Sequence, residues 1–241
     1  MIKKYLILLL PVLSGYTLDY SWTDFDNNVY IGGAYSNNNA SVNQFGAIST
    51  SSGALNLGLS MLFPAQVYFN IEGDTNFTSG GSFVANWYNV GAKLGYAFPV
   101  NAFNFIPYLS LGIGNEGAYY TSSANINYGI GLLSELAIDK SWQVYADINY
   151  QLQSLSGQAP SDFNNNVINN YASYSLSGSP YTYGITLGAK YITSKGFFIS
   201  PYVKYQNYNQ SFTSNGGSIN FGTINPQSSL YQAGIKIGLV L

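Results

Sequence analysis

The chain has 241 residues, of which only 7% are charged, and its formal net charge is −2. Soluble domains have roughly 25% charged residues, so this composition does not suit a soluble surface. The sequence contains no His and no Cys, which removes the most common general base, the usual transition-metal ligands and thiol chemistry. The small net charge and the lack of basic patches also argue against nucleic-acid binding.

Aromatic and small residues dominate the composition instead. The chain has 23 Tyr, 14 Phe and 26 Gly, and its mean hydropathy is +0.04. This value is too polar for a bundle of membrane helices and the charge is too low for a soluble protein. The combination fits a protein that has one face in lipid and the other in water.

The N-terminal residues have the pattern of a secretory signal peptide. Lys3 and Lys4 precede the apolar run Tyr5–Leu13, and the small residues Ser14 and Gly15 follow. This run is too short to cross a hydrocarbon core of about 30 Å as a helix. We therefore expect a signal peptide at 1–15, a periplasmic lead-in at 16–26 and a transmembrane barrel domain at 27–241.

Segments of about ten residues with alternating apolar and polar side chains follow along the chain. The first is Val29–Tyr35, and the last, Tyr231–Leu241, shows the alternation most clearly. Short connections are expected near 64–65, 99–104, 139–141 and 194–196, and long polar loops near 37–52, 75–85, 115–125, 153–179 and 208–228. The pattern predicts an all-β, antiparallel, up-and-down transmembrane β-barrel of about ten strands, with eight as the alternative if weak strands merge.

Aromatic residues occur near both ends of the apolar face of these segments. Those beside the short turns are Phe63, Phe98, Phe105, Trp142, Tyr191 and Phe197, and those at the loop ends are Tyr35, Tyr88, Tyr150, Tyr181, Tyr183, Tyr205 and Tyr231. Two aromatic girdles are typical of barrels in an outer membrane.

The charged residues within the strands all fall on the polar, inward face. They form a predicted lumen charge network of Glu72, Asp74, Lys93, Glu135, Asp147, Lys190, Lys204 and Lys236. Their positions on neighbouring predicted strands suggest the ion pairs Glu72–Lys93 and Asp147–Lys190. Inward tyrosines favour a filled lumen, namely Tyr30, Tyr68, Tyr108, Tyr145 and Tyr202. The alternative is a charged constriction that selects small solutes.

Motifs for chemistry are weak. The G-x-G-x-x-G match at 112–117 precedes a polar loop, and no amphipathic helix follows it. Asp24, Asp26 and Asn28 have the opening spacing of a calcium loop, but Val29 stands where Gly is required. The sequence predicts no catalytic residues, no cofactor and no metal site, and the long loop at 154–180 is the main candidate for surface contacts.

The signal peptide, the strand Val29–Tyr35 and the strand Tyr231–Leu241 resemble the small outer-membrane β-barrel superfamily, which includes OmpA-type, OmpX-type and opacity proteins. The resemblance implies a Gram-negative-type outer-membrane location, contact with lipid and lipopolysaccharide, and insertion by the barrel-assembly machinery. That machinery reads the C-terminal strand, which here presents Tyr231, Ile235, Ile237, Leu239 and Leu241, with Leu241 where the family usually ends in Phe.

Barrel enzymes of this compartment use a His in catalysis, so the sequence predicts a non-enzymatic protein. Its expected role is envelope structure or adhesion through the loops. A narrow porin-like diffusion channel is the alternative.

Overall fold

The computed structural model describes residues 21–42, 46–77, 88–114, 125–155, 174–176, 181–209, 212–214, 223–224 and 227–241. The expected signal peptide and the first part of the lead-in lie outside these residues, as does most of the loop at 154–180. Within the described ranges, no helix is long and apolar enough to cross a membrane.

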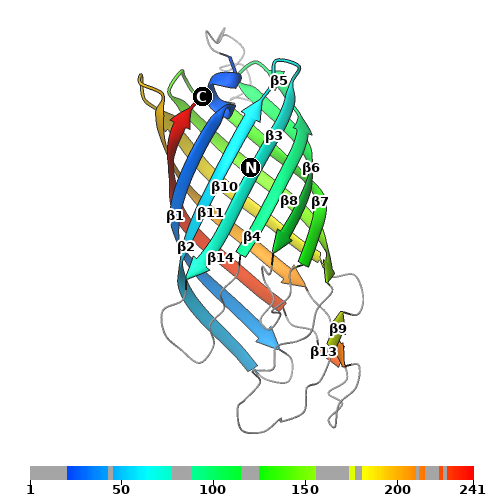
Figure 1. Ribbon diagram of the computed structural model, residues 1–241. Coiled ribbons are helices and arrows are strands. Elements are labelled where there is room, and N and C mark those ends of the chain that lie inside the picture. Colours follow the sequence, from blue (N-terminus) through cyan, green and yellow to red (C-terminus); the bar gives the residue numbers. More distant parts are fainter. Residues whose placement is uncertain are drawn as a thin grey trace, which may run out of the picture.

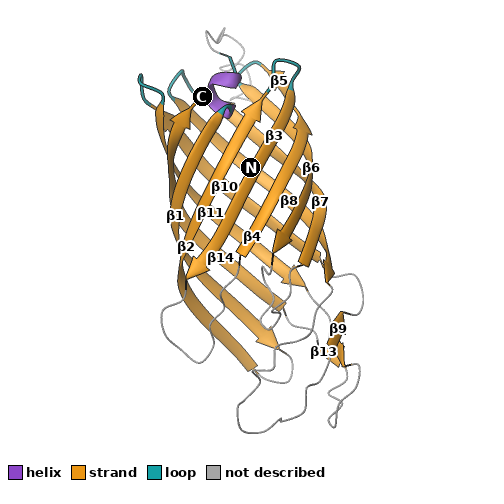
Figure 2. Ribbon diagram, in the orientation of Figure 1, coloured by secondary structure: helices purple, strands orange, loops and turns teal. Residues whose placement is uncertain are grey.

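Ten long antiparallel strands form the wall of the barrel (Figures 1 and 2). They are β1 (Asn28–Val42), β2 (Gly46–Leu62), β3 (Val67–Phe77), β4 (Tyr88–Tyr96), β6 (Phe103–Gly114), β7 (Asn125–Ala137), β8 (Trp142–Leu155), β10 (Tyr181–Ile192), β11 (Phe197–Asn209) and β14 (Gln227–Val240). Each strand pairs with its neighbours along the chain, and β1 pairs with β14 from Asn28↔Val240 to Ser41↔Gln227, which closes the ring. The predicted ten-strand antiparallel barrel is therefore confirmed.

Among the described residues, four short strands lie outside this ring. β5 (Phe98–Val100) pairs with β6 beside the end of β4. The other three, β9 (Tyr174–Leu176), β12 (Phe212–Ser214) and β13 (Thr223–Ile224), form a small separate sheet at the opposite end of the barrel (Figure 1).

The two ends of the barrel differ in their connections. At one end, called the turn end below, tight turns join β2 to β3, β5 to β6, β7 to β8 and β10 to β11. Gln66, Asn101 and Gly196 take positive φ angles of 64°, 54° and 79° in three of these turns. The opposite end of the barrel, where the long connections begin and end, is called the loop end.

The expected loop at 37–52 is wrong. β1 continues to Val42 and β2 begins at Gly46, and the two strands stay in register throughout. Side chains reinforce this hairpin, since the Tyr35 hydroxyl donates to Ser51 Oγ at 2.7 Å and Asn37 Nδ2 donates to the same oxygen at 3.2 Å. The sequence there contains the polar runs Asn37–Asn39 and Ser49–Ser52, so the alternating apolar pattern ends before the strands do.

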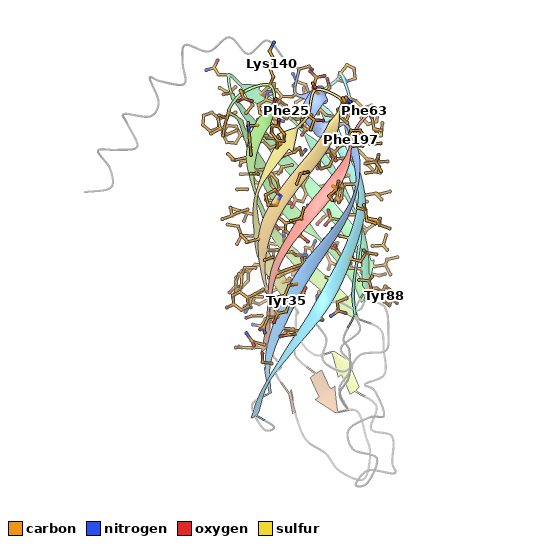
Figure 3. All side chains as sticks on the ribbon, turned by 90° about the vertical axis from the view of Figure 1, so that its left-hand side faces the viewer. Phe25, Tyr35, Phe63, Tyr88, Lys140 and Phe197 are labelled. Atoms are coloured by element: carbon orange, nitrogen blue, oxygen red, sulfur yellow. The ribbon has the colours of Figure 1, made fainter. Side chains whose placement is uncertain are left out.

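The outer wall is apolar, with aromatic side chains near each end. Ile235, Ile237 and Leu187 expose about half of their surface, as lipid-facing residues do in a protein without its membrane. Figure 3 shows Phe63 and Phe197 near the turn end, and Tyr35 and Tyr88 nearer the loops. Both predicted girdles are thus present on the outer surface.

Inward tyrosine rings lie against glycines of the adjacent strand. In four cases the tyrosine is the register partner of that glycine: Tyr30 with Gly58, Tyr108 with Gly131, Tyr145 with Gly188, and Tyr202 with Gly234. A Cβ atom at any of these glycines would overlap the ring. Because the rings line the wall in this way, they leave space along the barrel axis.

Candidate functional site

The barrel interior holds a polar cavity of about 170 Å³. Its lining includes all eight residues of the predicted charge network: Glu72, Asp74, Lys93, Glu135, Asp147, Lys190, Lys204 and Lys236. They face inward because successive side chains of a strand point to opposite faces. These eight side chains therefore line the lumen, and the inward tyrosines do not fill it completely.

One ion pair joins β14 to β3 across the intervening strands β1 and β2. Lys236 Nζ lies 3.0 Å from Glu72 Oε2. The Tyr30 hydroxyl donates to the same carboxylate oxygen and accepts from Lys236 Nζ at 3.1 Å. Lys236 Nζ also lies 4.3 Å from the centre of the Tyr30 ring, which adds a cation–π contact.

A second pair joins β4 to β8 across β6 and β7. Lys93 Nζ donates to Asp147 Oδ2 at 2.5 Å, and the Tyr108 hydroxyl donates to Asp147 Oδ1 at 2.5 Å. A looser third pair joins Lys204 on β11 to Asp74 on β3, with 4.0 Å between Nζ and Oδ2. These pairs brace the lumen between strands that are not neighbours.

The partners differ from those expected on adjacent strands. Glu72 stands opposite Gly91 in the β3–β4 register, and Lys93 stands opposite Asn70. On β8 and β10, Asp147 faces Thr186, and Lys190 faces Gln143. Because Lys side chains are long and the lumen is narrow, a carboxylate across the barrel is closer than one displaced along the neighbouring strand.

A short helix lies at the turn end of the barrel. This helix, α2 (Thr23–Asp26), lies at the end of the barrel near the C-terminus (Figures 1 and 2). Phe25 is 1% exposed and Asp26 is 2% exposed, and Figure 3 shows Phe25 at the same end as Phe63 and Phe197. Trp22 packs against a buried cluster of Leu62, Tyr68, Ala97 and Ile106. The described part of the expected lead-in at 16–26 therefore packs into the turn end, and α2 is called the plug below.

Polar groups from three strands meet this plug. Lys190 Nζ on β10 donates to the Phe25 carbonyl at 2.8 Å. Asn104 Nδ2 on β6 donates to Glu135 Oε2 on β7 at 3.0 Å and lies 3.5 Å from Asp26 Oδ2. Burial raises the pKa of the Asp26 carboxyl from 3.8 to about 6, because desolvation outweighs the attraction of the Lys190 ammonium.

Asp26 is the lumen residue that sequence reasoning missed. It precedes the first alternating strand, so its pattern indicated a solvated lead-in. With Asp26 included, the cavity lining contains five acidic side chains and four lysines. The burial of Phe25 beside it could not be predicted either, because the sequence shows only an aromatic residue shortly before the first strand.

Within the described ranges, no three acidic side chains lie together in a way that could hold a metal ion. The C-terminal strand presents Tyr231, Ile235, Ile237, Leu239 and Leu241 outward, with exposed fractions between 43% and 66%. The first four lie on the outward side of β14, which pairs with both β1 and β11, and Leu241 directly follows the strand.

The closed antiparallel barrel, its apolar outer wall between aromatic girdles and its charge-paired interior define a small β-barrel protein of a Gram-negative-type outer membrane. No protein-family model matches the sequence, and no curated protein matches it.

Solved structures of outer-membrane barrels are similar to this chain. The outer membrane protease OmpT from Escherichia coli aligns with 93% of this chain and 100% of its own, at 9% identity and a TM-score of 0.51. Neisserial surface protein A aligns with 87% of this chain and 96% of its own, at 14% identity and a TM-score of 0.34. OprG from Pseudomonas aeruginosa aligns with 89% of this chain and 96% of its own, at 12% identity and a TM-score of 0.42. At identities this low, the similarity shows a shared fold and does not indicate a shared activity.

Proposed function

We propose that this chain is a non-enzymatic outer-membrane barrel that acts through its outer face and long loops, in envelope structure or surface interaction. Its lumen is closed to solutes while α2 is docked. The observation that carries this proposal is the plug: Phe25 is 1% exposed inside the turn end, and Lys190 holds its carbonyl.

Further contacts of the lead-in support closure. Asn27 Oδ1 accepts from the Leu62 amide at 2.5 Å, and the Asn27 carbonyl accepts from the Leu241 amide at 2.8 Å. The residue after α2 is therefore bound both to the end of β2 and to the C-terminus. These contacts fix the plug at the seam where β1 and β14 close the barrel.

The arrangement of the carboxyl groups supports a non-enzymatic role. Asp147 is held by Lys93 and Tyr108, whereas Glu135 lies with Asn104 beside the plug. The two acids thus belong to separate clusters and do not face one another as an acid–base pair. The sequence also has no His to act as a base. Porins and channels occur among the similar solved structures, beside the protease OmpT.

The partners follow from the outer surface. We infer that the apolar wall binds outer-membrane lipid and that the girdle nearer the loops meets lipopolysaccharide. We also infer that the barrel-assembly machinery engages β14, whose residues Tyr231, Ala233, Ile235, Ile237 and Leu239 face outward.

A diffusion channel is the second candidate, because the cavity of about 170 Å³ leaves room for small solutes beyond the plug. Single-channel recording in planar bilayers separates the two proposals. In buffer at about pH 5, where Asp26 is protonated, we expect the refolded chain to give no conductance steps. Reproducible steps under this condition would show that the docked barrel conducts and would overturn the closed-lumen proposal. A variant lacking 16–26 is the matched control for an open turn end.

A further inference from the structure

The polar cluster beneath α2 contains one carboxyl group more than its cation can neutralise. Asp26 and Glu135 are 2% and 4% exposed, and Lys190 is the lysine beside them. The other lysines of the lumen have their own acids, since Lys93, Lys204 and Lys236 pair with Asp147, Asp74 and Glu72. If both carboxyl groups beneath α2 were ionised, the plug would enclose a net negative charge.

An unpaired buried charge is strongly unfavourable, and two close carboxyl groups relieve it by sharing one proton. The geometry supports such sharing, because Asn104 Nδ2 lies within 3.0 Å of Glu135 Oε2 and 3.5 Å of Asp26 Oδ2. Gln143, which is fully buried, stands on the same side of the barrel opposite Lys190. Asp26 belongs to a four-residue helix whereas Glu135 belongs to a paired strand, so Asp26 is the partner that we expect to move.

We propose that one proton shared between Asp26 and Glu135 holds α2 in the turn end, and that loss of this proton releases α2 and opens the lumen to the periplasm. The groups that face Asp26 are Glu135 on β7, Lys190 on β10 and the Tyr68 phenol on β3. On α2 itself, Asp24 is exposed and accepts from the Ser21 amide at 3.2 Å, so it takes no part in the cluster.

The direction of the pH effect follows from proton linkage. A carboxyl group whose pKa is raised by docking binds its proton more tightly when α2 is docked. Its contribution to docking is complete at acid pH and is lost as the pH rises towards about 6. The pKa of Asp26 rises from 3.8 to about 6 when α2 is docked. This rise makes the equilibrium constant for docking smaller at neutral pH than in acid, by on the order of 100-fold.

Thiol labelling can follow the plug directly, because the native chain has no Cys. A Phe25→Cys variant places a thiol at a 1% exposed position of α2, and a Ser21→Cys variant places one at an exposed position just before it. The ratio of their labelling rates with a membrane-impermeant maleimide cancels the intrinsic pH dependence of the thiol. We expect this ratio to be low at about pH 5 and to rise by about tenfold or more through pH 6.

Two charge variants in the same background test the role of the carboxyl group. Asp26→Asn should keep the ratio low at every pH, because the amide is never ionised. Asp24→Asn, on the exposed side of α2, should leave the rise intact. A flat ratio in the parent background, or an equal rise in Asp26→Asn, would overturn the proposal.

Bilayer conductance of the chain with native Phe25 gives a second measurement, in case Phe25→Cys weakens docking at all pH values. We expect no steps at about pH 5, steps at about pH 8, and silence at both in Asp26→Asn. Silence of the native chain at about pH 8 would refute opening of the lumen. Closure at about pH 8 on addition of calcium would show that a cation, rather than a proton, neutralises the cluster.

Discussion

Lys93 and Asp147 lie on β4 and β8, with two strands of the barrel wall between them, yet Nζ and Oδ2 are 2.5 Å apart. The bridge crosses the lumen and does not run along its wall. Asp147 also accepts from the Tyr108 hydroxyl, and that ring lies against Gly131. The charge network and the tyrosine–glycine packing are thus connected, and together they stabilise the shape of the barrel cross-section.

Removing one member of this pair should destabilise the barrel. A fully buried pair that loses one partner costs about 3 to 5 kcal/mol. Lys93 is 27% exposed and Asp147 is 13% exposed, so solvent reduces this cost. We expect Lys93→Met to lower the free energy of unfolding by about 2 kcal/mol, measured by urea titration in lipid vesicles.

The double variant Lys93→Met/Asp147→Leu is the matched control. It leaves no unpaired charge, so it should recover most of the loss seen in Lys93→Met. Additive losses in the double variant would mean that the two side chains do not interact in the membrane.

The tyrosine–glycine packing predicts a position-specific effect of adding one methyl group. Gly58→Ala places a Cβ against the Tyr30 hydroxyl, which is held by Glu72 and Lys236, so the ring cannot move without breaking these contacts. We expect a loss of about 1 to 3 kcal/mol in the free energy of unfolding. Gly33→Ala on β1 has open space around its Cβ and should be neutral or slightly stabilising. Equal effects at the two sites would refute the packing.

The number of strands, their antiparallel pairing and the inward placement of eight charges could all be predicted from the sequence. Period-two alternation decides these features, because a charge facing lipid is too costly to occur. The strand from Tyr231 to Leu239 illustrates this signal, since Tyr231, Ile235, Ile237 and Leu239 all face outward as their alternation predicts. Whether a side chain faces inward or outward depends mainly on its own polarity and on the membrane around the barrel.

Contacts across the lumen could not be predicted in the same way. Whether Glu72 meets Lys93 or Lys236 depends on the relative stagger of several strands and on side-chain reach. The burial of Asp26 depends on where the lead-in turns back into the barrel, and no periodic pattern covers four residues. The extension of β1 and β2 to Val42 and Gly46 was missed because runs of Asn, Ser and Thr interrupt the alternating apolar pattern there.

Lys190 predicts how the plug responds when its cation is removed. Lys190→Met leaves Asp26 and Glu135 without a nearby ammonium and also removes the donor to the Phe25 carbonyl. Docking then needs a proton on each carboxyl group, so release of α2 should occur at lower pH and over a narrower range. The thiol-labelling ratio at Phe25→Cys measures this shift. Release at unchanged or higher pH would mean that Lys190 does not neutralise the cluster.

Lysine substitutions on the two faces of the wall test the register of the whole barrel. Ile235 and Leu187 are 50% and 46% exposed on the outer surface, whereas Gln232 is 6% exposed and faces the lumen. Lys at either outer position should cost about 2 to 4 kcal/mol near the bilayer midplane and reduce assembly, measured as the folded fraction by heat-modifiable gel mobility. Gln232→Lys loses hydrogen bonds to Ser36 and Tyr202 but keeps its charge in the polar lumen, so it should assemble. Equal assembly of all three variants would mean that the outward and inward faces are wrongly assigned.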